Sequence, residues 1–189
     1  MSEGFAALYI NKTLPVAPGL LGHVFDRIVE DGLLASLFYD GSVRTRDEFL
    51  DEMSRPGTLP FVVMRGKDVA AFSWFNCILG RSARAHFAIF REFWGRKIRV
   101  SLGRNFYRYV LSRKDAEGHL FDCVYGITPE NNPLAWKAAL QSGWRLIGTI
   151  PSCVFLADTK MSVGGVVTAA TREILGIAEG EVVEATWDA

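Results

Sequence analysis

The stretch from Ala85 to Ile98, Ala-His-Phe-Ala-Ile-Phe-Arg-Glu-Phe-Trp-Gly-Arg-Lys-Ile, decides the fold predicted for this chain. Its first part belongs to a segment over 83–90 that alternates, with Arg84 and His86 on one face and apolar side chains on the other, as in a half-buried β-strand. Beyond Gly95 the apolar residues repeat every four positions, which predicts a helix over 94–113. The stretch is therefore a strand that turns at Gly95 into a helix.

Positive charge is concentrated around this junction. Between Arg91 and Lys114 there are eight basic residues and one acidic residue, Glu92, a net charge of +7 in a chain whose 21 Lys and Arg balance 21 Asp and Glu. Unpaired N–H groups and the helix dipole at a helix start favour an anion by about 0.3–1 kcal/mol at exposed sites. The junction therefore predicts an anion site that suits a phosphate. The alternative is that the basic residues only form the solvent-exposed face of a helix.

The elements on either side of this stretch combine an antiparallel meander of strands with crossover helices. Apolar spacing predicts a helix around 20–33, and Thr45 with Glu48 has the spacing of a capping box at the start of a second helix. The expected strands cover 5–10, 61–64, 69–79, 83–90, 120–127, 144–150 and 153–156, with a further helix over 132–142. This order predicts an α+β fold, a mixed α/β three-layer domain.

Composition excludes several classes of protein. The chain has 189 residues, 49% hydrophobic and 22% charged, which predicts an ordered core. Its three cysteines are an odd number without a CxxC pair, so they predict neither a disulfide framework nor a zinc site, and we expect no metal. No secretory leader and no run of about 18 apolar residues is present, so we expect a cytoplasmic chain without membrane attachment.

The composition changes near the end of the chain. From Met161 small residues and glycine dominate, and residues 172–189 carry one positive and five negative charges, a net of −4. We therefore expect a main domain over 1–158 and a C-terminal extension over 159–189 that serves as a tail or as a contact in a homo-oligomer.

Two segments resemble motifs of the GNAT superfamily of N-acyltransferases. The strand into Phe93-Trp94-Gly95-Arg96-Lys97-Ile98 is similar to the loop that binds the acyl-CoA pyrophosphate, and 129–135 with Ser142-Gly143-Trp144 is similar to the second motif. The resemblance covers about residues 5–158. It implies an acyl-CoA N-acyltransferase-like fold, with a mixed, mostly antiparallel sheet flanked by helices.

The resemblance also implies a co-substrate site. The N–H groups of the residues after the strand would face the pyrophosphate of acetyl-CoA or another acyl-CoA, with Phe90 at the strand end; these residues are Trp94, Gly95, Arg96, Lys97 and Ile98. Asn132 would hold the pantetheine arm or a water, although it also suits the cap of a helix that begins at Pro133. Lys97 stands where the family has a second small residue, and Ala139 where it often has an acidic tyrosine.

Candidate catalytic residues follow from the same alignment of elements. His86 is the proposed base, since an ordinary imidazole pKa of about 6.5 suits proton removal near neutrality. Tyr125 is the candidate acid in place of Ala139. Three polar or aromatic positions in one strand are a candidate substrate wall: Ser73, Trp74 and Asn76. Each of these residues also has a purely structural interpretation. His86 could be a hydrogen-bonded residue of the strand, Tyr125 a half-buried residue of the sheet, and the polar positions of the substrate wall could simply point outward.

Three functions remain open from the sequence. The first is transfer of an acyl group, most simply acetyl, from acyl-CoA to a primary amine on a small molecule or peptide by direct attack. The second is a catalytically inactive GNAT-fold binding or structural module, which Lys97 and Ala139 favour. Nucleic-acid binding through the basic helix ranks last, because its aromatic residues have the spacing of a packed core.

Overall fold

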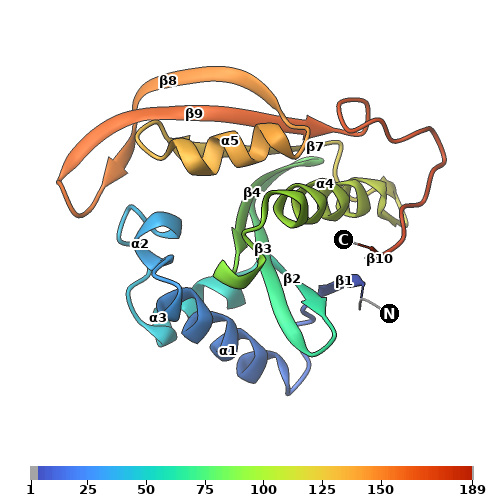
Figure 1. Cartoon of the computed structure of the whole chain (residues 1–189), viewed down its shortest axis with the longest axis horizontal. Helices are drawn as coiled ribbons and strands as arrows, with labels where there is room; N and C mark the ends of the chain where they lie inside the picture. Colours follow the sequence, from blue (N-terminus) through green and yellow to red (C-terminus); the bar gives the residue numbers. More distant parts are fainter. Residues whose placement is uncertain (1–3, 189) are drawn as a thin grey trace.

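The computed structural model describes residues 4–188 as a three-layer domain with a mixed eight-stranded sheet (Figure 1). The sheet has the order β10-β1-β2-β3-β4-β7-β9-β8, and β5 and β6 form a separate two-stranded ribbon. The elements are β1 (Phe5–Tyr9), α1 (Ala17–Glu30), α2 (Leu34–Leu37), α3 (Arg46–Ser54), β2 (Leu59–Arg65), β3 (Asp68–Leu79), β4 (Ser82–Ile89), η1 (Arg91–Phe93), α4 (Arg96–Ser112), β5 (Lys114–Asp115), β6 (Gly118–His119), β7 (Cys123–Pro129), α5 (Pro133–Gln141), β8 (Arg145–Leu156), β9 (Met161–Thr171) and β10 (Thr186–Trp187).

The core lies on both faces of the sheet. On one face Phe72 of β3 packs against Phe49 of α3, with ring centroids 5.7 Å apart. On the other face Phe75 of β3 stacks on Phe106 of α4 at 6.3 Å. Each of these four side chains is fully buried, and such burial stabilises the fold by about 1.5–3 kcal/mol per side chain. The predicted α+β architecture, a sheet between two helix layers, is confirmed.

Local sequence signals explain two of the helices. In α1 the apolar row faces the sheet and includes the fully buried Val24 and Ile28. At the start of α3 the Thr45 hydroxyl accepts a hydrogen bond from the Glu48 N–H at 3.3 Å, and the Glu48 carboxylate accepts one from the Thr45 N–H at 3.0 Å. Both predictions, the amphipathic helix and the capping box, are confirmed.

Strands β4 and β7 are parallel neighbours that separate after a short paired segment. Their register runs only from Ser82↔Cys123 to Arg84↔Tyr125. Beyond that point β4 stays paired with β3, while β7 stays paired with β9 as far as Pro129↔Gly165. The two strands therefore diverge and leave an opening in the middle of the sheet.

The C-terminal part of the chain differs from the expected extension. Residues 161–171 form β9, which lies between β7 and β8, so the boundary expected at residue 158 falls inside the sheet. The small residues reflect close packing: a Cβ on Gly165 would collide with Cys153 Sγ, and one on Gly164 would lie 2.5 Å from Glu130 Oε2. The two strands expected over 144–156 are one strand, β8, irregular between Ile150 and Val154.

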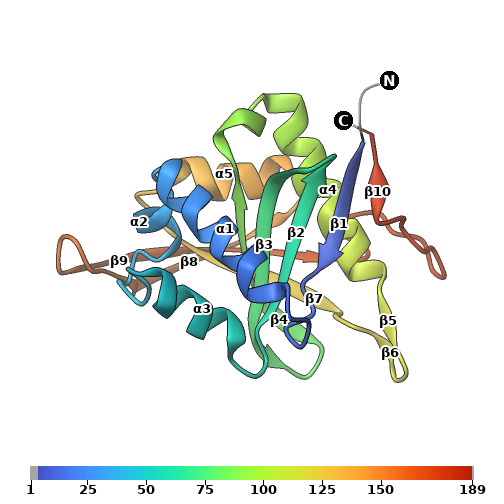
Figure 2. The same ribbon diagram turned by 90° about the horizontal axis from the view of Figure 1, so that it is seen from below.

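The acidic segment after β9 runs along α4 and returns to the sheet. Glu181 forms an ion pair with Arg108 of α4 at 2.6 Å, and the Val183 N–H donates to Ser112 Oγ at 3.1 Å. Strand β10 then pairs with β1 in the register Ala6↔Thr186, so the first and last strands of the described chain lie side by side (Figure 2). We call residues 176–187 the C-terminal strap.

Candidate active site

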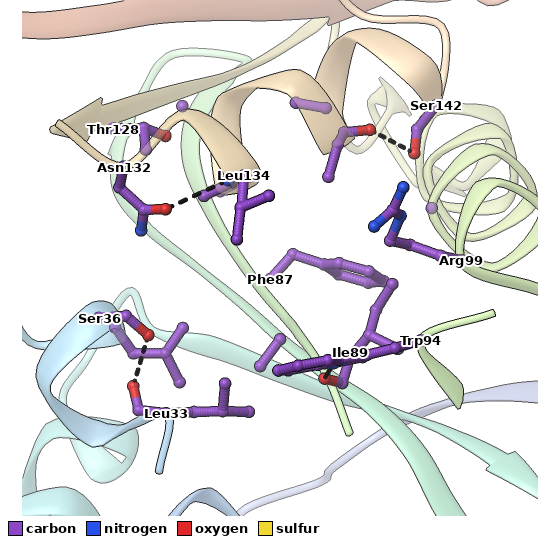
Figure 3. Close-up of a pocket in the computed structure, with 18 of the residues that line it drawn as sticks. Leu33, Ser36, Phe87, Ile89, Trp94, Arg99, Thr128, Asn132, Leu134 and Ser142 are labelled. Carbon is purple, nitrogen blue, oxygen red and sulfur yellow. Dashed lines mark hydrogen bonds between the residues drawn. The ribbon is translucent and has the colours of Figure 1, made fainter. Parts of the chain in front are cut away.

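A cavity of about 470 Å³ opens where β4 and β7 diverge, and it continues between α4 and α5. Figure 3 shows Leu134 of α5 facing Phe87 of β4 across it. The lining is mainly apolar and includes Ala85, Phe87, Ile89, Trp94, Gly126, Thr128, Asn132, Leu134, Ala138 and Ala139. An elongated ligand can therefore reach from the surface into the middle of the sheet.

The edge of β4 presents backbone groups to this opening. The Phe90 N–H bonds to Ala70 of β3 at 3.0 Å, so even-numbered residues of β4 direct their backbone groups toward β3. Phe87 and Ile89 consequently direct theirs toward β7, which has already diverged. A ligand that carries spaced amide groups can pair with such an edge as an added strand does.

The junction between β4 and α4 forms the outer end of the cavity. Phe90 and Phe93 are buried and anchor it, whereas the Trp94 side chain is 43% exposed and donates its indole N–H to the Ile89 carbonyl at 2.7 Å (Figure 3). Helix α4 begins at Arg96, and its N-cap, Gly95, supplies no side-chain bond. The first N–H groups of α4 therefore face outward, where an anion can bind them.

The basic run of this region is divided among several partners. The Arg91 N–H donates to Asp31 Oδ2 at 2.6 Å, Arg99 donates to Gln141 Oε1 at 2.8 Å, and Arg108 is paired with the strap. Within residues 4–188, no ion pair or hydrogen bond engages the side chain of Arg96 or Lys97, and both are exposed. These two cations at the helix start, with Ile98 half-buried behind them, are the part of the run that can meet an anion.

Asn132 has a structural role and also reaches the cavity. Its Oδ1 accepts a hydrogen bond from the Ala135 N–H at 3.3 Å and so caps α5, as the sequence alternative predicts. The same side chain lines the cavity (Figure 3). Ala139 lines it as well, so no phenol of α5 is present at that position.

His86 is not among the residues that line the cavity, and its side chain lies on the opposite face of β4 from Ala85, Phe87 and Ile89. Its ring stacks on Trp74 at 4.4 Å between centroids, and its Nε2 is 3.1 Å from Asn76 Oδ1. Burial, with a further contribution from the nearby Arg84 charge, lowers the pKa of His86 to about 3. The imidazole is therefore neutral at pH 7 and is a weak base.

The other predicted substrate and acid residues surround His86. Ser73 is buried and donates to the His86 carbonyl at 2.7 Å, while Trp74 is 1% exposed and belongs to the core. Asn76 and Tyr125 are half-buried, and Tyr125 is the register partner of Arg84 on the neighbouring strand. These side chains gather near the opening, but they are not part of the cavity wall.

Tyr39, in the connection between α2 and α3, escaped the sequence analysis. Its hydroxyl accepts a hydrogen bond from Arg84 Nη2 at 2.7 Å and donates one to the Ile127 carbonyl at 3.4 Å, so it bridges β4 and β7 where they part. Burial raises the pKa of Tyr39, and the Arg84 guanidinium partly offsets this. A tyrosine in an irregular segment carries no periodic signal, and only the folded chain places it here.

Sequence comparison finds no family model that matches the chain and no matching curated protein. Solved structures do match. Spermidine N-acetyltransferase from Vibrio cholerae in complex with CoA and spermine has a TM-score of 0.69 at 14% identity, over 90% of this chain and 97% of that one. Aminoglycoside N(6')-acetyltransferase from Legionella pneumophila has a TM-score of 0.66 at 16% identity, over 93% and 96%.

A third neighbour extends the same result. The Salmonella typhimurium acetyltransferase that modifies the N-terminal serine of ribosomal protein L7/L12 has a TM-score of 0.68 at 12% identity, over 89% of this chain and 95% of that one. The chain therefore has the fold of the GNAT N-acetyltransferases, as the two motifs predicted. In the part of the chain that the structure describes, no helix is long and apolar enough to cross a membrane.

Proposed function

We propose that this chain, which has the GNAT fold, is an acyl-CoA-dependent N-acyltransferase that transfers an acetyl group to a primary amine by direct attack. The observation that carries the proposal is the divergence of β4 and β7 after Arg84↔Tyr125, with a cavity that runs from this point to the start of α4. Solved neighbours with this fold hold CoA or acetyl-CoA. An elongated ligand with a charged end and a reactive end fits such a cavity.

In this proposal the pyrophosphate meets the backbone N–H groups of residues 94–98, and Arg96 and Lys97 add positive charge there. The pantetheine arm follows the open edge of β4, where Phe87 offers its N–H and C=O groups and Ile89 its N–H, and Asn132 lies along the wall. The Ile89 carbonyl becomes available to the arm when the Trp94 indole leaves it. The thioester then lies at the inner end of the cavity. A backbone N–H of the β4 edge that points at the carbonyl oxygen stabilises the negative charge that develops during attack.

The acceptor amine must arrive without its proton or lose it to water. His86, the expected base, is poorly suited to take the proton directly, because its pKa is about 3. Its contact with Asn76 instead holds both side chains beside the opening. The solved neighbours include enzymes named for spermidine, for aminoglycosides and for a protein N-terminus, so the acceptor class of this chain is an amine of a small molecule or a peptide.

Isothermal titration with acetyl-CoA tests the co-substrate directly. We expect saturable heat with one site per chain, and competition by CoA. Release of the CoA thiol, followed with a chromogenic disulfide in the presence of a panel of polyamines, amino sugars and short peptides, then tests turnover. An absence of heat at millimolar acetyl-CoA, with an unchanged circular dichroism spectrum, would remove the enzyme proposal.

A second candidate is a GNAT-fold module that binds acyl-CoA without transferring the acyl group. The weak basicity of His86 and the alanine at position 139 favour it, since both remove groups that can move a proton. The two candidates differ in the same assay: the module binds acetyl-CoA but releases no thiol with any amine of the panel.

A further inference from the structure

We infer that the acceptor of this chain is a primary amine on an apolar body without a second positive charge, and that polycationic amines are excluded. The inference rests on the proposed acyltransferase function and narrows its acceptor class. It is carried by the cavity walls on the α2 side of the sheet, which are apolar, and by the charges of the residues that line the cavity.

The cavity opens on both faces of the sheet. Side chains alternate along β4, and Phe87 faces the α4 layer, since its ring lies 5.5 Å from that of Phe106. The next residue, Ala88, therefore faces the layer of α1–α3. Both residues line the cavity, so a ligand can enter it from either side of the sheet.

The part of the cavity on the α2 side is free for the acceptor. We call it the acceptor compartment, and it is lined by Leu33, Ser36, Leu37 and Ala88. Figure 3 shows Leu33 and Ser36 across the cavity from Leu134 of α5. The proposed donor occupies the α5 side, so an amine that attacks the thioester carbonyl directly arrives through the acceptor compartment.

The walls of the acceptor compartment suit an apolar body. Leu33 and Leu37 are half-buried and Ala88 is buried. The hydroxyl of Ser36 donates a hydrogen bond to the Leu33 carbonyl at 2.8 Å, so it is already used within the fold. An ammonium group held against such walls loses water and gains no counter-ion, which weakens its binding.

The charges of the cavity also disfavour a polycation. Its lining includes one acidic residue, Asp31, and two basic residues, Arg91 and Arg99, a net charge of +1. Asp31 Oδ2 accepts a hydrogen bond from the Arg91 N–H at 2.6 Å, and the Arg91 side chain donates to the Asp31 carbonyl at 3.1 Å. Arg99 donates to the neutral Gln141. The only carboxylate of the lining is therefore offset by an adjacent guanidinium.

Carboxylates in the segments next to the cavity are bonded within the fold and are not part of its lining. Asp40 Oδ1 accepts a hydrogen bond from the Ser42 N–H at 3.0 Å, and Glu130 Oε1 accepts one from the Gly164 N–H at 2.9 Å. In the proposed complex the donor phosphates bring negative charge to residues 94–98, beside the exposed cations of the helix start. A second ammonium in the acceptor compartment thus meets no available anion.

A matched pair of amines tests the inference. n-Butylamine and 1,4-diaminobutane have the same carbon chain and differ by one amino group at the far end. Their chain length is comparable to the single helical turn, about 5.4 Å, that separates Leu33 from Leu37, so the second ammonium cannot avoid these walls. Release of the CoA thiol from acetyl-CoA gives kcat/KM for each amine. We expect a preference of at least about tenfold for n-butylamine.

Substitutions on α2 connect that preference with the acceptor compartment. Ser36→Asp supplies a counter-ion at an exposed position, and Ser36→Asn is its reference because it has the same shape without the charge. The ratio of kcat/KM for n-butylamine to that for 1,4-diaminobutane should be about fivefold lower in Ser36→Asp than in Ser36→Asn. Ala35→Asp, which is exposed and outside the lining, adds the same charge one position away and should keep the wild-type ratio.

The outcomes separate the two proposals. Failure to bind acetyl-CoA, or binding without thiol release for every amine of the panel, overturns the proposed function and this inference together. Thiol release with 1,4-diaminobutane at a kcat/KM equal to or above that of n-butylamine overturns the inference alone, as does an equal ratio in Ser36→Asp and Ser36→Asn. Turnover confined to polyamines or amino sugars overturns it as well.

Peptide acceptors are covered by the same comparison. If thiol release is confined to the peptides of the panel, two peptides that differ only in leucine or lysine at the second residue replace the two amines. Preference for the leucine peptide supports the inference, and equal use of the two peptides or preference for the lysine peptide overturns it.

Discussion

His86 illustrates how neighbours decide what a residue can do. From the sequence, a single histidine on the polar face of a strand suggests a base near neutrality. In the structure its ring is stacked on Trp74 and its pKa is lowered to about 3, mainly by burial. The alternation along β4 predicts the face of the residue correctly, but it contains no information about how deeply α1–α3 cover that face.

The lowered pKa of His86 makes stability depend on pH. The imidazole has a pKa of 6.5 in the unfolded chain and of about 3 in the folded chain. Between pH 6.5 and about pH 3 the unfolded chain therefore binds a proton that the folded chain does not. Lowering the pH through this range destabilises the fold. The effect of one group is at most about 1.4 kcal/mol per pH unit. In His86→Gln the slope of unfolding free energy against pH should fall by close to this amount between pH 6 and pH 4.

Urea titrations at several pH values measure that slope. The variant keeps a hydrogen-bonding side chain opposite Asn76, and any uniform loss of stability shifts the curve without changing its slope. Equal slopes for the wild type and the variant would show that His86 titrates normally.

Gly95 and Gly103 form a pair that separates binding from folding. A Cβ on Gly95 would meet no atom closer than 3.9 Å, whereas one on Gly103 would collide with Ser142 Oγ where α4 meets α5. Gly95→Ala should change stability by less than about 1 kcal/mol. It should nevertheless weaken CoA binding about tenfold or more, because the methyl group stands where the phosphates approach the backbone.

Gly103→Ala should have the opposite profile. Overpacking costs about 1–3 kcal/mol, which exceeds the roughly 1 kcal/mol that alanine gains over glycine within a helix. Urea unfolding and calorimetric titration of both variants check the pair. Unchanged CoA affinity in Gly95→Ala would place the phosphates elsewhere.

At the scale of elements, β9 was the main difference between sequence and structure. The spacing of apolar residues correctly predicted α1, α4 and the β2–β4 meander, because each has a clear period, and the capping box at Thr45 correctly predicted α3. Residues 161–171 show no clear alternation of polar and apolar side chains, since β9 is covered by α5 on one side and flanked by β7 and β8. Its glycines are required by Glu130 and Cys153, which lie in other elements.

The C-terminal strap is attached to α4 chiefly through one arginine. Arg108 pairs with Glu181 and donates to the Leu175 and Gly176 carbonyls at 2.7 Å and 3.1 Å. Hydrogen bonds to a charged group contribute about 1.5–3 kcal/mol, so Arg108→Ala should destabilise the chain by about this amount. Hydrogen exchange should become faster over 176–187.

Arg104 provides the control on the same helix. It is exposed and has no bonded partner among the residues that the structure describes, so Arg104→Ala should change stability by less than about 0.5 kcal/mol. Equal effects of the two substitutions in urea unfolding would mean that the strap contributes little to the fold.

At the scale of the whole molecule, the layers were predictable but the opening was not. Local patterns predict strands and helices, and two short motifs point to the GNAT fold. The divergence of β4 from β7 depends on pairing between segments about 40 residues apart, and the Tyr39 bridge depends on a loop that reaches Ile127, 88 positions away. Contacts of this kind leave no periodic trace in a single sequence.

Removal of residues 159–189 tests the position of β9 in the fold. Strand β9 is the only described strand that pairs with β8 and the one that holds the outer edge of β7. A chain that ends at Asp158 should therefore show no cooperative unfolding and should aggregate. A chain that ends at Gly180 keeps β9 and should fold with reduced stability. Cooperative unfolding of the chain that ends at Asp158 would contradict this expectation and would support a separate domain over 1–158.

The indole of Trp94 has a practical consequence. Its N–H occupies the Ile89 carbonyl, and its ring stands at the mouth of the cavity while Trp74 and Trp144 are buried. Any co-substrate that pairs with that carbonyl must displace the ring and change the polarity around it. The chain has five tryptophans, so the difference in fluorescence emission between the wild type and Trp94→Phe isolates the contribution of this indole. That difference is an optical signal for occupancy that needs no label, acceptor or turnover.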